Sequence, residues 1–261
     1  MRADKFLAER FSSRTKAAEY IERGQVLVNG KVIRPKDEIK EGDEITIIKG
    51  EEEFVSNGGY KLARAKKEFS LDFSSLTCVD IGASTGGFTD CLLQGGAKKV
   101  YAVDVGESLL DPSLKEDSRV VIMDNTNARY LEKEDFAEEI EFIVTDVSFI
   151  SLSYIFPIIF KVLANEGQAV ALIKPQFECE GKHIGKSGIV NPQFHLKIIE
   201  KVLDEALNNG LYPVAITNAP VRKGKNIEYV LLLEKVGKSD IKTLLKRVKE
   251  IVKNNSLGIL Q

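Results

Sequence analysis

The 261-residue sequence is long enough for one large or two modest domains, and its 43% hydrophobic and 29% charged residues are ordinary for a soluble globular protein. The net charge of −2 provides no overall attraction to nucleic acid, so an RNA-binding site would have to be a local basic patch. Cys78, Cys91 and Cys179 are odd in number, widely spaced and without a CxxC motif, which predicts free thiols in a reducing cytosol instead of a disulfide framework or a zinc site. Two histidines leave a metal few ligands. We therefore expect no metal site.

The most apolar run, residues 149–164, contains Pro157 and Lys161. It is shorter than the ~20 apolar residues that a bilayer-spanning helix requires, so it predicts a buried helix. The first residues of the chain lack the apolar core of a signal peptide. These features predict a cytoplasmic protein that has no contact with a membrane.

The first 50 residues predict a small α+β domain. Apolar residues recur at helical spacing over residues 2–11 and again over residues 13–23, where Ser13 is a suitable N-cap. Asn29-Gly30 lies between two β-branched runs, which predicts a hairpin, and residues 44–48 predict a further strand.

The charge within this predicted domain is uneven. Residues 1–36 contain nine Lys and Arg against four Asp and Glu, whereas residues 37–53 contain eight acidic residues and two lysines. A basic face is typical of a phosphate-binding surface, although a solvated helix face has the same composition. The residues that we expect to bind RNA are Arg2, Lys5, Arg14, Lys16, Arg23 and Lys31.

The rest of the chain predicts an α/β domain. Residues 51–59 are acidic and end in Asn57-Gly58-Gly59, which predicts a linker between domains at 1–50 and 60–261. Short apolar runs then alternate with helical segments, which predicts βαβ units and a mostly parallel sheet. The expected elements are a helix at 60–69, strands at 77–81, 99–105, 119–123, 141–145 and 168–173, an antiparallel pair at 212–217 and 228–233, and a helix at 239–254.

A glycine-containing loop at a strand-to-helix junction predicts a cofactor site. Glycines there let the backbone approach a ligand, and the next helix offers free N–H groups. The spacing Gly-x-x-x-Gly-Gly differs from that of dinucleotide sites, yet an adenosyl group of either cofactor class would fit. Asp104, at the end of the second strand, is placed to accept from ribose hydroxyls, and 124–127 lie where an adenine edge would be. The expected cofactor contacts are Asp80, Gly82, Ala83, Ser84, Thr85, Gly86, Gly87, Phe88, Asp104, Asp124, Asn125, Asn127 and Asp146.

Several ordered motifs together resemble the TlyA (haemolysin A-like) family, in which an S4 RNA-binding domain precedes an FtsJ-like (RrmJ-type) ribosomal RNA 2′-O-methyltransferase domain. The resemblance covers nearly the whole chain. It depends on Arg2-Ala3-Asp4, 24–30, Gly58-Gly59-Tyr60-Lys61-Leu62, 80–90, Thr126-Asn127-Ala128-Arg129, 146–152, Lys174-Pro175-Gln176-Phe177-Glu178 and Lys225-Asn226-Ile227-Glu228-Tyr229.

The resemblance implies a Rossmann-like class I methyltransferase fold with one antiparallel strand, and S-adenosylmethionine as the cofactor. It also implies methylation of a cytidine ribose in 23S, and in some members 16S, ribosomal RNA, presented free or in a ribosomal subunit. The family's Lys-Asp-Lys-Glu constellation maps onto Lys61, Asp146, Lys174 and Glu228. Asp146 and Lys174 end predicted strands at the edge where open α/β sheets bind ligands. Lys174 would be the general base or the group that orients the 2′-hydroxyl.

Three alternatives stay open at this point. The protein could methylate a base or a small molecule, it could be a membrane-active cytotoxin as the haemolysin name implies, or it could be a noncatalytic RNA-binding factor. His183 and His195 are expected in a loop and on a helix surface, and residues 181–188 are expected to form a loop that could close over RNA.

Overall fold

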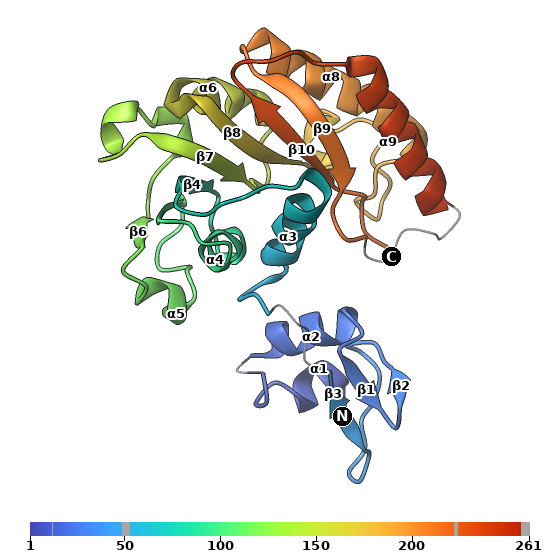
Figure 1. Cartoon of the computed structure of the whole chain (residues 1–261). Helices are drawn as coiled ribbons and strands as arrows, with labels where there is room; N and C mark the ends of the chain where they lie inside the picture. The colour runs from blue at the N-terminus through green and yellow to red at the C-terminus, as the bar shows by residue number, and fades with distance from the viewer. Residues whose placement is uncertain (12, 49–52, 222–223, 257–261) are drawn as a thin grey trace. The chain divides into compact units, whose positions relative to one another are not determined.

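The computed structural model describes residues 1–11, 13–48, 53–221 and 224–256. The chain divides into two compact units, Met1–Asn57 and Gly58–Gln261 (Figure 1). Residues 51–52 of the expected linker lie outside the described residues. Helix α3 begins at Asn57, three residues before the predicted start at Tyr60. Gly58 lies in its first turn, where a Cβ would meet Phe88 Cδ1 at 3.4 Å.

The first unit is a small sheet packed against two helices. Its elements are α1 (Ala3–Phe6), α2 (Arg14–Glu22), β1 (Val26–Val28), β2 (Lys31–Val32) and β3 (Ile45–Ile47), and the antiparallel strand order is β2-β1-β3. The hairpin prediction is confirmed, because Asn29 and Gly30 have φ values of 50° and 73°, the positive pair that a type I′ turn requires. Ser13 caps α2 by accepting from Lys16 N at 3.1 Å.

The prediction of one helix over residues 2–11 is wrong in its length. Helix α1 ends at Phe6, and the chain continues in turns to Phe11. Leu7 and Phe11 are both buried in the core of the unit with Ile21 of α2. Tertiary packing of these apolar side chains therefore decides the conformation of the segment, since helical periodicity is only a weak local preference.

The second unit contains a seven-stranded sheet of order β6-β5-β4-β7-β8-β10-β9. Strands β4 to β8 are parallel, and β10 is antiparallel to both of its neighbours, which confirms the predicted mostly parallel sheet. The strand bounds are Thr77–Ile81 (β4), Lys99–Val103 (β5), Val120–Met123 (β6), Ile140–Thr145 (β7), Leu163–Ile173 (β8), Tyr212–Asn218 (β9) and Tyr229–Glu234 (β10).

Helices cover this sheet, and Figure 1 shows α8 and α9 beside β9. One buried cluster joins apolar residues of β4, β7, β8 and β10 to residues of α6, α8 and α9. The helix bounds are Asn57–Phe69 (α3), Gly87–Gln94 (α4), Pro112–Lys115 (α5), Phe156–Val162 (α6), Pro175–Glu178 (α7), His195–Asn208 (α8) and Ile241–Ser256 (α9), with 3₁₀ turns at Ala128–Tyr130 (η1), Lys133–Asp135 (η2), Leu152–Tyr154 (η3) and Pro192–Phe194 (η4).

The prediction of a single buried helix over residues 149–164 is wrong. Helix α6 covers only Phe156–Val162, with Pro157 in its first turn, and Leu163 already belongs to β8. Phe149 lies in the loop after β7 with a side chain that is 91% exposed. Proline lacks an N–H group, so it favours the first turn of a helix and opposes extension of the helix toward the N-terminus.

Candidate active site

The carboxyl ends of the parallel strands carry most of the candidate site residues. Gly82 follows β4, Asp104 follows β5, Asp146 follows β7 and Lys174 follows β8. Glu228 immediately precedes β10, whose antiparallel direction brings its beginning to the same edge. Parallel strands thus gather residues from four distant parts of the chain, as ligand sites of open α/β sheets do.

The four residues of the Lys-Asp-Lys-Glu set form one continuous chain of ion pairs. Lys61 Nζ lies 2.8 Å from Glu228 Oε2 and 3.0 Å from Asp146 Oδ2. Asp146 Oδ1 in turn lies 2.6 Å from Lys174 Nζ. Opposite charges alternate along this chain, which lowers the cost of holding them in a mostly buried position.

Lys61 is the central cation of this chain and lies on α3. Burial by itself would lower the pKa of its ammonium group, but the carboxylates of Asp146 and Glu228 outweigh burial and raise the pKa above its usual value. Lys61 therefore stays protonated near neutral pH and connects two carboxylates that would otherwise repel each other.

Lys174 is the most buried member of the set, with a side chain that is 9% exposed. Its ammonium group donates to Ser148 Oγ at 2.8 Å and to the carbonyl of Asp146 at 3.5 Å, in addition to its ion pair with the Asp146 carboxylate. It also lies 5.9 Å from the centre of the Phe177 ring. These contacts fix Nζ in one place, against the first residues of the loop after β7.

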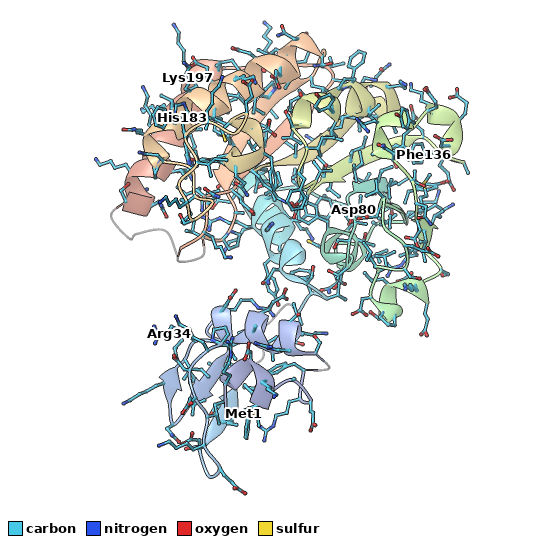
Figure 2. All side chains as sticks on the ribbon, turned by 180° about the vertical axis from the view of Figure 1, so that it is seen from behind. Met1, Arg34, Asp80, Phe136, His183 and Lys197 are labelled. Carbon is cyan, nitrogen blue, oxygen red and sulfur yellow. The ribbon has the colours of Figure 1, made fainter. Side chains whose placement is uncertain are left out.

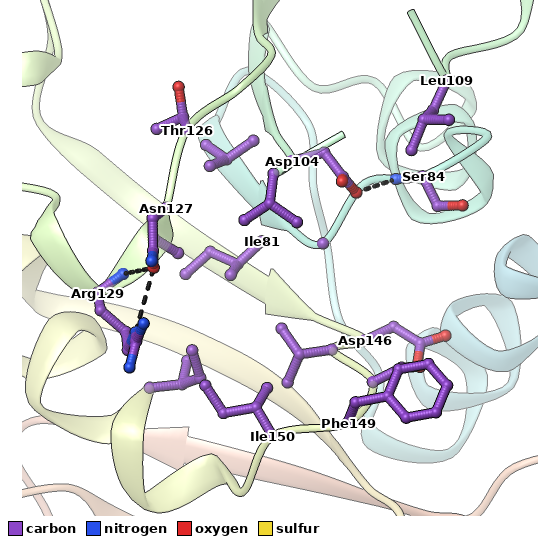
Figure 3. Close-up of a pocket in the computed structure, with 17 residues that line it drawn as sticks. Ile81, Ser84, Asp104, Leu109, Thr126, Asn127, Arg129, Asp146, Phe149 and Ile150 are labelled. Carbon is purple, nitrogen blue, oxygen red and sulfur yellow. Dashed lines mark hydrogen bonds between the residues drawn. The ribbon is translucent and has the colours of Figure 1, made fainter. Parts of the chain in front are cut away.

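Asp146, a member of this ion-pair chain, also lines a cavity of about 340 Å³ (Figure 3). Its lining includes five of the residues predicted to contact a cofactor: Gly82, Ser84, Asp104, Asn127 and Asp146. Asp104 Oδ2 accepts from Ser84 N at 2.8 Å, and its Oδ1 accepts from Gly106 N at 2.8 Å. Both oxygens keep a further lone pair, so the carboxylate can still accept from a ligand.

The remaining predicted cofactor residues are absent from the lining of this cavity: Asp80, Ala83, Thr85, Gly86, Gly87, Phe88, Asp124 and Asn125. Asp124 accepts from Ser108 N at 2.8 Å, and Asn125 makes a turn with φ of 54°. Gly86 also has a packing role, because a Cβ there would lie 2.2 Å from Leu114 Cδ1, and its φ of 90° favours glycine.

Asp80 is completely buried in the second unit (Figure 2). It accepts from Thr89 N at 2.9 Å and from Thr89 Oγ1 at 2.7 Å, which joins β4 to the start of α4 behind the glycine loop. Burial raises the pKa of the carboxyl group to about 7, although the two hydrogen bonds from Thr89 act in the opposite direction.

We expect the stability of the wild type, relative to Asp80→Asn, to fall as the pH rises from about 4 to about 7. The Asp80 carboxyl group binds its proton more tightly in the folded state than in the unfolded state. Proton binding therefore stabilises the fold fully below the pKa that Asp80 has in the unfolded chain, and this stabilisation is lost as the pH rises through the pKa of Asp80 in the folded protein. Urea unfolding of both proteins across this pH range measures the difference. A difference in unfolding free energy between the two proteins that stays constant with pH would show that the pKa of Asp80 is not raised in the folded state.

Two groups near the site were not identified from the sequence. Ser148 Oγ accepts a hydrogen bond from Lys174, and Phe149, a residue that is 91% exposed, lies beside Asp146 (Figure 3). The Phe149 ring lies 5.1 Å from that of Phe177, and Phe149 has a φ of 65°. Both lie in the 146–152 motif that contributes to the sequence resemblance, and this motif was the signal that could have identified them.

The expectation that His195 lies on a helix surface is wrong. His195 is buried at the start of α8, and its Nδ1 lies 2.8 Å from the Tyr229 hydroxyl group. The loop over 181–188 is held at one end, because Asn226 donates to Gly188 O at 3.0 Å and accepts from Val190 N at 2.8 Å. His183 lies in this loop and stacks on Phe194.

The basic residues predicted to bind RNA differ in how firmly they are held. Arg2 and Arg14 both lie 3.0 Å from the buried carboxylate of Asp4, while their own side chains are 53% and 56% exposed. Hydrogen bonds from Arg2, together with Arg14, lower the pKa of Asp4. Lys5 and Lys31 are exposed, whereas Lys16 and Arg23 are partly buried, and the Arg23 guanidinium lies 4.5 Å from the Tyr20 ring centre.

Across residues 1–11, 13–48, 53–221 and 224–256, the structure contains no helix that is both long and apolar enough to span a membrane.

Comparison with known proteins identifies both units. Residues 54–235 match the FtsJ-like methyltransferase family, and residues 1–45 match the S4 domain. The chain is 44% identical over 236 residues to Hemolysin A of Brachyspira hyodysenteriae, covering 88% of this chain and 98% of that protein. It is 36% identical over 225 residues to the 16S/23S rRNA (cytidine-2′-O)-methyltransferase TlyA of Mycobacterium tuberculosis (strain CDC 1551 / Oshkosh), covering 85% and 84%.

A solved structure of a hemolysin-type protein of Streptococcus thermophilus aligns with a TM-score of 0.75 at 38% identity, covering 98% of both chains. The resemblance and the fold class predicted from the sequence are thereby confirmed. The chain belongs to the FtsJ-like methyltransferase family, as a member that carries an N-terminal S4 domain.

Proposed function

We propose that the protein transfers a methyl group from S-adenosylmethionine to the 2′-hydroxyl group of a cytidine in ribosomal RNA. The observation that carries this proposal is the ion-pair chain of Glu228, Lys61, Asp146 and Lys174 beside a cavity of about 340 Å³. The family supports methyl transfer, and the name of the relative TlyA supports cytidine 2′-oxygen as the acceptor. This substrate would place the protein in the cytoplasm.

The cavity suits an adenosyl cofactor in size and chemistry. Its volume lies within the roughly 300–1,000 Å³ that small-molecule sites occupy. Asp104 offers carboxylate oxygens to ribose hydroxyls, and the exposed apolar side chains of Val105 and Leu109 offer a surface for the adenine ring. S-adenosylmethionine supplies a methyl group that is already electrophilic, so the protein mainly has to position the acceptor oxygen.

Lys174 works on the acceptor side in this proposal. Asp146 and Ser148 line the cavity and also hold Lys174, so the ammonium group lies one contact away from the cofactor space. A ribose hydroxyl group that reached this position could replace the Ser148 hydroxyl group as the acceptor of a hydrogen bond from Lys174 Nζ. The ammonium form of Lys174 would then orient the oxygen, and only its neutral amine form could take the proton that the oxygen loses as it attacks the methyl group. Lys61 would hold the carboxylates of Asp146 and Glu228 in place.

The first unit would supply most of the RNA affinity. Buried Asp4 holds the guanidinium groups of Arg2 and Arg14 at the surface, which reduces the entropy lost when they meet phosphate oxygens. In the second unit, the exposed ring of Phe149 provides a face on which an unstacked base can lie.

The proposal is tested by incubating the protein with S-adenosylmethionine and unmodified ribosomal RNA, ribosomal subunits or whole ribosomes. Digestion to nucleosides and mass spectrometry should reveal 2′-O-methylcytidine in at least one of these substrates. A methyl group on a base would replace the proposal with a base-directed methyltransferase. Tight RNA binding without methylation of any substrate would favour a noncatalytic factor instead.

We expect Asp104→Ala to weaken binding of S-adenosylmethionine by ~1.5–3 kcal/mol, the range for a lost hydrogen bond to a charged group. The matched control is Asp124→Ala, since Asp124 also follows a parallel strand but does not line the cavity. Isothermal titration calorimetry should find the control close to wild type. Equal affinities for the wild type and Asp104→Ala would remove Asp104 from the cofactor site.

A further inference from the structure

A second connection joins the segments that carry Asp146 and Lys174, and it does not involve the ion-pair chain. Glu178 lies at the end of α7, one helical turn after Lys174, and is only 6% exposed. Its Oε2 accepts from Ser151 Oγ at 2.6 Å, and its Oε1 accepts from Leu152 N at 2.9 Å. One buried carboxylate therefore binds a side chain and the backbone of the loop that follows β7.

This loop, residues 146–152, carries three of the groups that the proposed function places near the acceptor ribose. Asp146 and Ser148 hold Lys174, and Phe149 presents its ring to solvent. Near the far end of the loop, Ser151 is the N-cap of η3 and accepts from Ser153 N at 3.2 Å. Glu178 thus binds the loop at the end opposite to Asp146.

The conformation of the loop needs such a support. Phe149 has a φ of 65°, which is unfavourable for a bulky residue, and its exposed ring gains little from burial. A strained backbone of this kind persists only where the surrounding contacts determine it. The two hydrogen bonds that the Glu178 carboxylate accepts are contacts of this kind, and their donors lie two and three residues after Phe149.

We propose that Glu178 is a positioning residue for methyl transfer, because it holds the loop of residues 146–152 in the conformation that places Ser148 on Lys174 and the Phe149 ring against Phe177. This inference depends on the proposed function for its effect on turnover, but its effect on the loop is independent of any activity. Glutamine at this position can accept from Leu152 N and donate to the Ser151 hydroxyl, whereas alanine can do neither.

The loop can be observed directly, because the sequence contains no tryptophan. Phe149→Trp therefore creates a protein whose single tryptophan lies on the loop and can be excited selectively over the tyrosines. In this background, Glu178→Ala should lower the fluorescence anisotropy and increase quenching by acrylamide, while Glu178→Gln should leave both close to the parent. The matched control is Glu180→Ala, which removes an exposed carboxylate two residues away that pairs with Lys182 and Lys201.

Turnover is measured in the protein with Phe149 intact. Glu178→Ala should lower kcat on ribosomal RNA by about tenfold to a hundredfold, the scale of a small misplacement of reacting groups, and should leave the Kd for S-adenosylmethionine unchanged. Glu178→Gln should restore most of the turnover. Ser151→Ala should cause a smaller loss, and combining it with Glu178→Ala should add little, because the two residues share one hydrogen bond.

An unchanged anisotropy in the Glu178→Ala protein would overturn the proposal, and so would a Glu178→Gln protein as impaired as Glu178→Ala. Loss of cofactor affinity in parallel with turnover would show general damage to the fold. If Glu178→Ala does not fold, Glu178→Gln and Ser151→Ala decide the question in the same two assays. If the wild type methylates no RNA, the proposed function fails, and the anisotropy measurements still test the role of Glu178 in the loop.

Discussion

Lys174→Ala should reduce methyl transfer to ribosomal RNA by at least about 100-fold, the lower limit of what a positioned acid–base group contributes. The cofactor should bind with nearly unchanged affinity, because Lys174 contacts Asp146 and Ser148 and is absent from the residues that line the cavity. Asp146 keeps its second partner, Lys61, so its charge stays compensated in the variant. Single-turnover kinetics and calorimetry together separate these two effects.

The control for this experiment is Lys249→Ala, which removes an exposed lysine of α9. Lys61→Ala should also be severely impaired, and the double variant should be little worse than either single variant, because members of one catalytic unit give non-additive losses. A Lys174→Ala protein with most of the wild-type turnover would exclude Lys174 from the reaction. Strictly additive losses would show that the two lysines act separately.

Deleting residues 1–50 should lower kcat/KM on ribosomal RNA by about 100-fold or more, the scale on which a tethered second binding module raises affinity. Binding of S-adenosylmethionine should persist, because the cavity is lined only by residues of the second unit. Methylation assays with ribosomal substrates and calorimetry with the cofactor measure both effects. Truncated protein that modified its RNA target as well as the full chain would contradict our account of substrate selection.

Point variants in the first unit provide the matching test without a deletion. Lys5→Gln and Lys31→Gln remove exposed charges, whereas changes at Arg2 or Arg14 would also leave the buried Asp4 carboxylate less compensated. Removing a lysine that contacts a phosphate should reduce the magnitude of the slope of log K against log salt concentration by ~0.7–0.9. A slope that is the same in the wild type and both variants would place the RNA-binding face elsewhere.

The sequence by itself determined the elements of the sheet and the residues at its edge. Short apolar runs between helical segments are a local signal, and parallel pairing then brings the ends of distant strands together. Asp146 and Lys174 each directly follow such a run and Asp104 lies at the end of one, so their position at one edge could be predicted without knowledge of packing. The Asn29-Gly30 hairpin was predictable for the same reason, since the turn depends only on its own backbone.

Only the tertiary structure decided which of these residues face the cavity and what holds them there. Gly86 belongs to the predicted cofactor loop, yet the space beside it is filled by Leu114. Phe149 belongs to an apolar run that predicted a buried helix, yet its ring is exposed. Glu178 meets Leu152 across 26 residues of sequence. Periodicity describes a residue's own element, whereas these outcomes depend on contacts between segments far apart in the chain, which no local pattern encodes.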